Sequence, residues 1–199
     1  MILSIPPRQQ KGSESVAFWE NFLTDDDIAQ LLNLPQWQQI QQATVGLNAM
    51  GIVAPSIRQS QTAWFVPCEK TKHIWEKIVN AIAEVNRSFF HLDLTGCYEP
   101  GQLSLYVGSE QAHYDWHIDM SEKTDTVPRK LSMSLMLSNP NDFEGGELQI
   151  KANSDEVKNA EQAKGRAWFF PSYMLHRVAP VTKGVRRSLV LWVGGPPFR

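Results

Sequence analysis

The chain has 199 residues, of which 42% are hydrophobic and 20% are charged, and its formal net charge is −2 at pH 7. A chain of this length can bury a sizeable core as one domain, and the near-neutral charge gives no electrostatic reason to expect binding to nucleic acid or to an anionic membrane. The sequence has no apolar run of about 18 residues and no signal-peptide pattern, and its two cysteines are too few for a disulfide framework. We therefore expect a cytoplasmic protein with reduced thiols, whose oligomeric state the sequence leaves open.

The first half of the chain predicts helices. Residues 1–13 are polar and are predicted to form a loose lead-in. Thr24 precedes three aspartates, and a hydroxyl cap followed by acidic side chains favours the positive end of a helix dipole, which predicts a helix start. A second helix is predicted from apolar residues three and four positions apart, which form one stripe suited to packing on the outside of a sheet. The stripe consists of Ile74, Ile78, Ile82, Val85 and Phe89.

Near Gln102 the pattern changes to short strand-like runs separated by turns. The clearest runs are residues 103–107, 131–137, 147–150, 167–170 and 188–193. Several short strands after a helical segment favour a mainly β fold with supporting N-terminal helices, a distorted double-stranded β-helix or cupin-like jelly roll. We expect a single domain over residues 1–199, with a helical support region at 1–100 and the jelly-roll core at 101–199. Residues 151–164 are polar and poor in β-branched side chains, so they are predicted to be a mobile excursion and not a strand.

Three residues have the chemistry of metal ligands. In an extended segment residues i and i+2 point to the same face, so His117 and Asp119 can reach one ion. His176 follows a turn and begins an apolar alternation, which suits a third ligand from a neighbouring strand. Two imidazoles and one carboxylate can hold iron(II) on one side and leave positions open for a cosubstrate and dioxygen.

A second His-x-Asp pair, His113 and Asp115, precedes the first. Residues 113, 115, 117 and 119 would share one face of a regular strand, so the alternation does not choose between the two pairs. A single pair of this kind is more often solvated or ion-paired than bound to metal, and the downstream sequence has to support it.

The downstream sequence contains an ordered series of motifs. They are YDWHID (114–119), RKLS (129–132), FEGGEL (143–148), FPS (170–172), LHRVAPV (175–181) and GVRRSL (184–189). With these motifs the chain, from about Gln102 to its C-terminus, resembles the iron(II)- and 2-oxoglutarate-dependent dioxygenases, in particular the prolyl 4-hydroxylase-like branch. In that family an aromatic residue lies three positions before the ligand His, which Tyr114 fits for His117. We therefore favour the later pair as ligands and expect the earlier pair at the site entrance or in solvent.

The resemblance implies Fe(II), 2-oxoglutarate as cosubstrate and O2, with ascorbate as a reductant. In the family, the basic residue ten positions after the distal His binds the remote carboxylate of 2-oxoglutarate, and here that residue is Arg186. Independently of the resemblance, an arginine is permanently charged and presents a planar fork that pairs with a carboxylate through two hydrogen bonds. Arg187 is expected to point to the other side of the strand.

The chain departs from the family at one cosubstrate-binding position. Many relatives carry a Tyr on the strand after the ligand pair, whereas here the corresponding residue is Met136, which cannot donate a hydrogen bond. We expect either that Tyr106 or Ser188 supplies the missing donor, or that Arg186 holds the carboxylate with less help.

Three residues are predicted on the substrate side. Tyr114 lies beside the ligand pair in the sequence. Trp192 shares the strand face of Arg186, and is either a wall of the cavity or ordinary core. Arg58 begins an Arg-x-Ser that resembles the segment bordering the substrate groove in prolyl hydroxylase-like enzymes, and either contacts substrate or forms a surface ion pair.

The resemblance implies a hydroxylase of an aliphatic C–H bond that releases succinate and CO2. We expect its substrate to be a prolyl or other amino-acid residue in a protein or peptide. The alternatives are hydroxylation of a free amino acid or small metabolite, and a non-catalytic metal-binding jelly-roll protein. A cupin-type isomerase or hydrolase is a further class, but it would have no use for 2-oxoglutarate. No nucleic-acid or membrane partner is expected.

Overall fold

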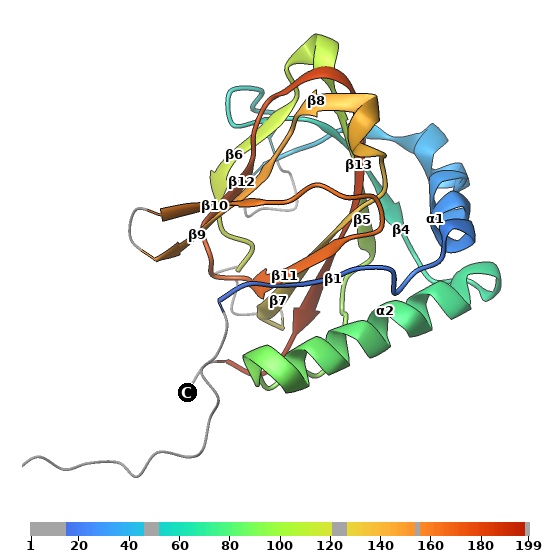
Figure 1. The fold of residues 1–199 in the computed structure, drawn as a ribbon, viewed down its shortest axis with the longest axis vertical. Coiled ribbons are helices and arrows are strands. Elements are labelled where there is room, and N and C mark those ends of the chain that lie inside the picture. Colours follow the sequence, from blue (N-terminus) through green and yellow to red (C-terminus); the bar gives the residue numbers. More distant parts are fainter. Residues whose placement is uncertain (1–14, 46–51, 121–126, 154–155, 198–199) are drawn as a thin grey trace, which may run out of the picture.

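A computed structural model describes residues 15–45, 52–120, 127–153 and 156–197, so the lead-in predicted for residues 1–13 lies outside the described residues. Within these ranges the chain forms two antiparallel sheets, and the two longer helices lie beside the larger sheet (Figure 1). The predicted mainly β architecture with helices ahead of it is confirmed.

The larger sheet has eight strands in the described part of the chain. Their order is β1 (Ala17–Trp19), β11 (Ala167–Pro171), β7 (Arg129–Met136), β13 (Val181–Gly194), β5 (Gly101–Val107), β4 (Gln61–Phe65) and β2 (Gln41–Gln42), and β8 (Phe143–Gly145) also pairs with β13. β13 pairs with β5 and β7 on its two sides, which places it centrally in the sheet.

The smaller sheet has the order β10 (Glu156–Ala160), β9 (Leu148–Asn153), β12 (His176–Val178), β6 (His113–His117) and β3 (Arg58–Gln59). The longer helices are α1 (Asp25–Leu32) and α2 (Lys72–Val85). Short helical turns lie at η1 (Pro35–Gln39), η2 (Glu69–Thr71), η3 (Asn86–Phe90), η4 (Gly108–Glu110) and η5 (Pro140–Asp142).

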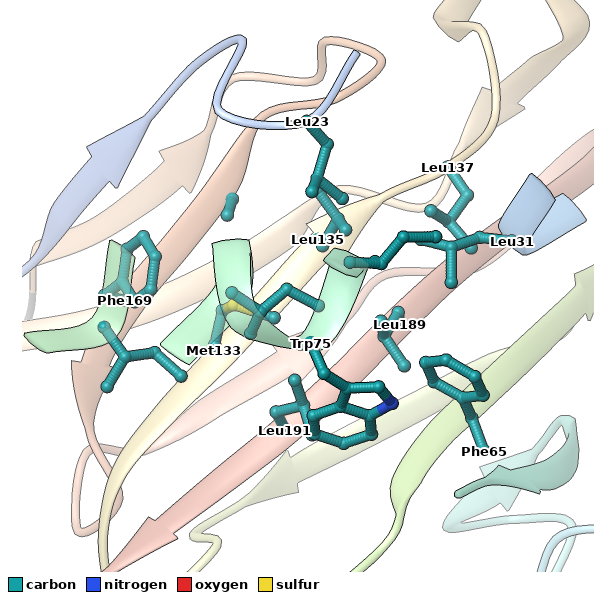
Figure 2. Packing of buried hydrophobic residues seen from close by; sticks show 14 of the residues in the cluster. Leu23, Leu31, Phe65, Trp75, Met133, Leu135, Leu137, Phe169, Leu189 and Leu191 are labelled. Carbon is teal, nitrogen blue, oxygen red and sulfur yellow. The ribbon is translucent and has the colours of Figure 1, made fainter. Parts of the chain in front are cut away.

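Side chains of the larger sheet alternate between a hydrophobic core and a cavity, because successive residues of a strand point to opposite faces. One face of β7 and β13 packs against α1 and α2 (Figure 2). The core residues on this face are Leu131, Met133, Leu135, Leu189 and Leu191. The opposite face lines a cavity between the sheets, and its residues include Ser134, Arg186, Ser188 and Trp192. The sheet therefore separates the packed core from the site.

The predicted apolar stripe on α2 packs on the larger sheet, with one change at its end. Ile74 and Ile78 are fully buried in the main core, as predicted. Phe89 is 38% exposed, however, whereas Phe90 is only 7% exposed. The helix ends in a π turn, in which the His91 N–H donates to the Asn86 carbonyl. This turn adds one residue to the helical repeat, so Phe90 and not Phe89 reaches the core.

The predicted N-terminus of α1 is confirmed, and its third aspartate ties the two helices together. Thr24 caps the helix, and its side chain and backbone exchange hydrogen bonds with Asp27 in a capping box. The Asp27 carboxylate also accepts from Lys77 of α2 at 2.6 Å and lies 3.3 Å from Nε2 of His73. Burial disfavours its charge, but the hydrogen bonds from Lys77 and Thr24 prevail and lower the pKa of Asp27 to about 2.

Asp27→Asn is expected to lower the free energy of unfolding by about 1–3 kcal/mol near neutral pH, because Lys77 and Thr24 lose a buried, charged acceptor. A carboxyl whose folded pKa is depressed stabilises the fold above its unfolded pKa, which is 3.8 here, and loses that contribution as the pH falls towards about 2. The difference between wild type and variant should therefore shrink with acid. Urea unfolding across this pH range measures it, and the exposed Asp26→Asn on the same helix is the control. Equal acid dependence in all three proteins would contradict the expectation.

The prediction of a strandless excursion at residues 151–164 is wrong. Residues Leu148–Asn153 and Glu156–Ala160 form the β9–β10 hairpin at the edge of the smaller sheet. Gln149 donates to Asn159 across the hairpin, and Ala160 is 4% exposed. β10 pairs with β9, which is itself paired with β12, and this pairing stabilises a polar sequence as a strand. The intrinsic strand propensity of the residues does not predict such pairing.

Candidate functional site

The structure brings His117, Asp119 and His176 together. His117 ends β6, Asp119 follows it, and His176 begins β12, where it is the register partner of His117. One ligand atom from each of the three side chains lies within 4.8 Å of the others. Nε2 of His117 is 3.8 Å from Oδ1 of Asp119, and Nε2 of His176 is 3.4 Å from Oδ2. Two strands that are distant in the sequence thus present three donors to one point.

Backbone carbonyls fix the orientation and the tautomer of both imidazoles. Nδ1 of His117 lies 2.8 Å from the carbonyl oxygen of Asp115, and Nδ1 of His176 lies 2.9 Å from that of Met174. A carbonyl oxygen only accepts hydrogen bonds, so Nδ1 carries the proton in each ring and Nε2 keeps its lone pair. Both Nε2 atoms lie on the side of Asp119, which is the arrangement that a bound metal requires.

The charges of the site also suit a divalent metal. Burial lowers the pKa of His117 to about 4, and the neighbouring His176 adds to the effect. Burial opposes the ionisation of Asp119, but His176, His117 and the Ser132 hydroxyl outweigh it and lower the pKa of the carboxyl. At neutral pH the site therefore offers a neutral imidazole at His117 and a carboxylate at Asp119. This donor set fits iron(II), with His176 as the third ligand.

A bulge in β6 corrects the predicted alternation of the ligand strand. Two residue steps on β12, from His176 to Val178, are paired with three steps on β6, from His117 to Tyr114. The Tyr114 ring therefore stacks on the His117 ring at 3.5 Å and lines the cavity. The expectation that residues 113, 115, 117 and 119 share one face is wrong. Asp115 is exposed, and neither it nor His113 lines the cavity.

Arg186 is a buried cation without an ion-pair partner among the described residues. It is 2% exposed and lines the same cavity of about 710 Å³ as the three candidate ligands. Its Nη1 donates to Ser188 Oγ at 3.1 Å, and its Nε has no hydrogen-bond partner among the described residues. Burial lowers the pKa of Arg186 and Glu147 opposes that shift, but no described carboxylate forms an ion pair with it. An arginine keeps its charge at neutral pH, so the cavity is prepared for an anion.

Local backbone geometry leaves room for the Arg186 side chain. Gly146 has a φ of 69°, and a Cβ atom there would lie 2.9 Å from Cδ of Arg186. Only glycine combines this left-handed conformation with the close approach. Arg187 faces the opposite side of β13, where its guanidinium lies over the Trp37 ring. The predicted difference in direction between the two arginines therefore agrees with the geometry.

The residues proposed to replace the missing tyrosine lie around Arg186. Tyr106 is the register partner of Arg186 on β5, and the guanidinium lies 5.3 Å from the centre of its ring. Ser188 is the register partner of Met136 on β7 and accepts from Arg186. Both Tyr106 and Ser188 line the cavity, whereas Met136 packs into a hydrophobic cluster beside it.

Met136→Tyr is expected to tighten 2-oxoglutarate binding by about 0.5–1.5 kcal/mol, the net contribution of one added hydrogen bond. The small cavity that Met136 lines has a volume of only about 10 Å³, so the larger ring should lower stability by about 1–3 kcal/mol. Titration of both proteins with 2-oxoglutarate in the presence of Mn²⁺ measures the first effect, and thermal unfolding measures the second. Unchanged or weaker binding by a folded variant would show that Tyr106 or Ser188 already fills the role.

The other predicted substrate-side residues also lie on the cavity. Trp192 lines it, and Arg129 covers the indole at 3.7 Å while pairing with Glu99. The Trp192 N–H makes no hydrogen bond to a described residue, although its proximity helps to lower the pKa of Asp119. Arg58 is 7% exposed and stacks on Tyr114 at 4.4 Å, so the alternative of a surface ion pair is not what the structure shows.

Sequence reasoning assigned no role to Ser132 and Ser172. The Ser132 hydroxyl donates to Oδ2 of Asp119 at 2.7 Å, and the Ser172 hydroxyl lies 2.9 Å from that of Ser132. The sequence does contain a pattern that could have identified Ser132. From Leu131 to Leu135, serines alternate with large apolar residues. Such an alternation marks a strand with one polar face, and here that face points toward the site.

A sequence model of the 2OG-Fe(II) oxygenase superfamily matches residues 101–194, which contain the three candidate ligands and Arg186. A PKHD-type hydroxylase of Janthinobacterium sp. (strain Marseille) is 33% identical over 172 residues, which cover 84% of this chain and 71% of the relative. The chain belongs to the 2OG-Fe(II) oxygenase superfamily. A PKHD-type hydroxylase of Synechococcus sp. (strain JA-2-3B'a(2-13)) is 33% identical over 129 residues, 59% of this chain and 53% of the relative. The chain thus spans about half the length of this curated relative.

Solved structures of two prolyl hydroxylases show the same fold. A prolyl hydroxylase from Trichoplax adhaerens, in complex with a peptide fragment of the oxygen degradation domain of hypoxia inducible factor, superposes with a TM-score of 0.71 at 23% identity. That comparison covers 90% of this chain and 83% of the hydroxylase. A prolyl-4-hydroxylase from Pseudomonas putida gives a TM-score of 0.68 at 21% identity and covers 92% of this chain and 94% of that one. The predicted double-stranded β-helix is confirmed.

The two longer helices of the described residues, α1 and α2, pack beside the larger sheet. None of the helices in that part of the chain combines the length and the hydropathy that crossing a membrane requires.

Proposed function

We propose that this protein is an Fe(II)- and 2-oxoglutarate-dependent dioxygenase that hydroxylates an aliphatic C–H bond and releases succinate and CO2. Arg186 is the observation that supports this function best. It is a buried cation that no described carboxylate neutralises, in the same cavity as the three candidate ligands. A buried charge is costly unless it is paired, so the cavity favours a dianionic cosubstrate that can reach both the metal and Arg186.

Each residue of the site has a part in this function. His117, Asp119 and His176 would hold the iron through the two Nε2 atoms and one carboxylate. Arg186 would pair with the remote carboxylate of 2-oxoglutarate, with Ser188 and Tyr106 beside it. Bound iron supplies the activation of dioxygen and the oxidation of the substrate, while the protein supplies position and electrostatics.

The cavity mouth supports a protein or peptide substrate. Trp64 is 49% exposed and Tyr98 is 59% exposed, and both line the cavity. Inside the cavity, Nη2 of the buried Arg58 has no hydrogen-bond partner among the described residues. An aromatic rim around an unpaired donor suits an apolar residue, such as a prolyl residue, whose backbone carbonyl needs a partner. The structural neighbour from Trichoplax adhaerens, which is described with a peptide, agrees with this class of substrate.

The same unpaired donor leaves a second candidate substrate. Arg58 could instead pair with the carboxylate of a free amino acid or another small acid, because an arginine binds a carboxylate through two hydrogen bonds. Arg58→Gln separates the two cases, since an amide still donates to a backbone carbonyl but cannot neutralise a carboxylate. A small acid should lose most of its affinity for this variant, whereas a peptide should keep most of it.

The test of the proposed function is production of succinate from 2-oxoglutarate by the purified protein with Fe(II), O2 and ascorbate. Peptide and metabolite mixtures are then screened by mass spectrometry for products that have gained one oxygen atom. His176→Ala is the control for activity from free iron. Metal and 2-oxoglutarate binding without succinate, in the presence of every mixture, would favour the non-catalytic jelly-roll alternative. A lack of 2-oxoglutarate binding would contradict the assignment of Arg186.

A further inference from the structure

The carboxylate of Asp119 is held by two serines that come from different strands. Ser132 lies on β7 and is fully buried, and Ser172 follows β11 directly and is also fully buried. Oδ2 of Asp119 accepts the Ser132 hydroxyl at 2.7 Å, and the two serine hydroxyls are 2.9 Å apart. Asp119 itself is 9% exposed. The carboxylate is therefore attached to the larger sheet, although the two histidines belong to the smaller one.

The direction of these hydrogen bonds follows from what each group can donate. A carboxylate only accepts, so the single proton of the Ser132 hydroxyl points to Asp119. The contact between the serines then requires the Ser172 hydroxyl to donate to Ser132. A hydroxyl that accepts a hydrogen bond becomes a stronger donor, so Ser172 strengthens the bond from Ser132 to the carboxylate.

Ser172 also fixes the backbone of the ligand. Its carbonyl accepts the N–H of Asp119 and the N–H of Met120, each at 2.9 Å. The main chain of Asp119 is thus held by Ser172, and one oxygen of its carboxylate is held by Ser132 on the neighbouring strand β7. Rotation of the carboxylate about its side-chain bonds would break the bond to Ser132 and leave a fully buried hydroxyl without its acceptor.

We propose that the pair Ser132 and Ser172 is a positioning device that engages Oδ2 of Asp119, so that the carboxylate binds the metal through one oxygen and leaves a position for 2-oxoglutarate. The inference rests on the proposed function. A free carboxylate can bind a metal through both oxygens. 2-Oxoglutarate would chelate the metal through its 1-carboxylate and its keto oxygen. A second oxygen from the Asp119 carboxylate would compete with it for these positions. Ser132 and Ser172 are positioning residues, because they act through Asp119.

The experiment compares wild type with Ser132→Ala, Ser172→Ala and Ser134→Ala. Ser134 is the matched control, because it lies on the same face of β7 and has no described hydrogen bond to Asp119. Mn²⁺ affinity is measured by calorimetry without oxygen, and 2-oxoglutarate affinity is then measured at saturating Mn²⁺. Ser132→Ala should weaken Mn²⁺ binding by about 10- to 100-fold, the usual effect of removing a partner of a metal ligand. Ser172→Ala should have the smaller effect, and Ser134→Ala should bind Mn²⁺ as wild type does.

The second measurement separates positioning from general weakening of the metal site. At saturating Mn²⁺ the metal site is occupied even in a variant that binds Mn²⁺ weakly. If the serines only stabilise the metal site, the variant should then bind 2-oxoglutarate with wild-type affinity. The proposed role predicts that Ser132→Ala still binds 2-oxoglutarate roughly 10-fold more weakly, a difference equal to about one hydrogen bond. If both Ser132→Ala and Ser172→Ala bind 2-oxoglutarate with wild-type affinity, the inference is overturned but the proposed function is not. Failure of wild type to bind Mn²⁺ or 2-oxoglutarate would instead overturn the proposed function. If Ser132→Ala does not fold, Ser172→Ala provides the same comparison.

Discussion

Replacing His117, Asp119 or His176 with Ala is expected to abolish the turnover of 2-oxoglutarate to succinate. Removal of a partner that merely orients a ligand already costs about 10- to 100-fold in metal affinity or activity, and loss of a ligand itself should cost more. The fold should survive, because the three side chains line a cavity and lie outside the main hydrophobic core. Succinate production with excess Fe(II) measures the first effect, and thermal unfolding without metal measures the second.

The earlier His-x-Asp pair provides the matched control for this experiment. His113 and Asp115 have the same residue types on the same strand, but neither lines the cavity. His113→Ala and Asp115→Ala should therefore keep nearly all the activity. Wild-type turnover in a variant of any proposed ligand, with its metal content measured, would remove that residue from the site.

Arg186→Ala is expected to weaken 2-oxoglutarate binding by about 2–5 kcal/mol, because the remote carboxylate would be buried without its partner. Arg186→Lys should recover part of the loss, since the charge is kept but the two-pronged geometry is not. The variant should not unfold more easily, because Arg186 has no ion-pair partner in the described residues of the free protein. Calorimetric titration with 2-oxoglutarate in the presence of Mn²⁺ and without oxygen measures these affinities.

Arg187→Ala is the control, because this neighbour lies over Trp37 on the opposite face of β13. Its backbone N–H donates to Ser138, and that bond does not depend on the side chain. The apparent affinity for 2-oxoglutarate should change only slightly. A damaging Arg187→Ala together with a mild Arg186→Ala would mean that the register of β13 is displaced by one residue and that Trp192 lies outside the cavity.

Several features of this protein follow from its sequence because they depend on local periodicity. The four-residue and three-residue spacing from Ile74 to Val85 predicts the buried face of α2, and the cap at Thr24 predicts where α1 begins. The period of two along β13 separates Arg186 from Arg187 and places Trp192 beside the former. The ligand residues themselves were recognised from the resemblance to a family, and the structure brings them together.

The rest was decided by contacts between segments that are far apart in the sequence. The bulge in β6 arises from its pairing with β12, and it places Tyr114 and not His113 beside His117. The π turn after α2 brings Phe90 into the core, and the pairing of β10 with β9 makes a strand of residues that lack strand propensity. No local sequence pattern predicts the bulge, the π turn or the β9–β10 pairing, because each is stabilised by a partner strand or by core packing.

The site shows the same division. The sequence by itself determined which donors were available, since the residue types of His117, Asp119, His176 and Arg186 specify the chemistry. Only the tertiary structure decided their states. Backbone carbonyls select the imidazole tautomers, and burial without an ion pair to any described residue prepares Arg186 for an anion. Protonation, orientation and charge depend on neighbours within a few ångströms in space, and the chain brings those neighbours together only when it folds.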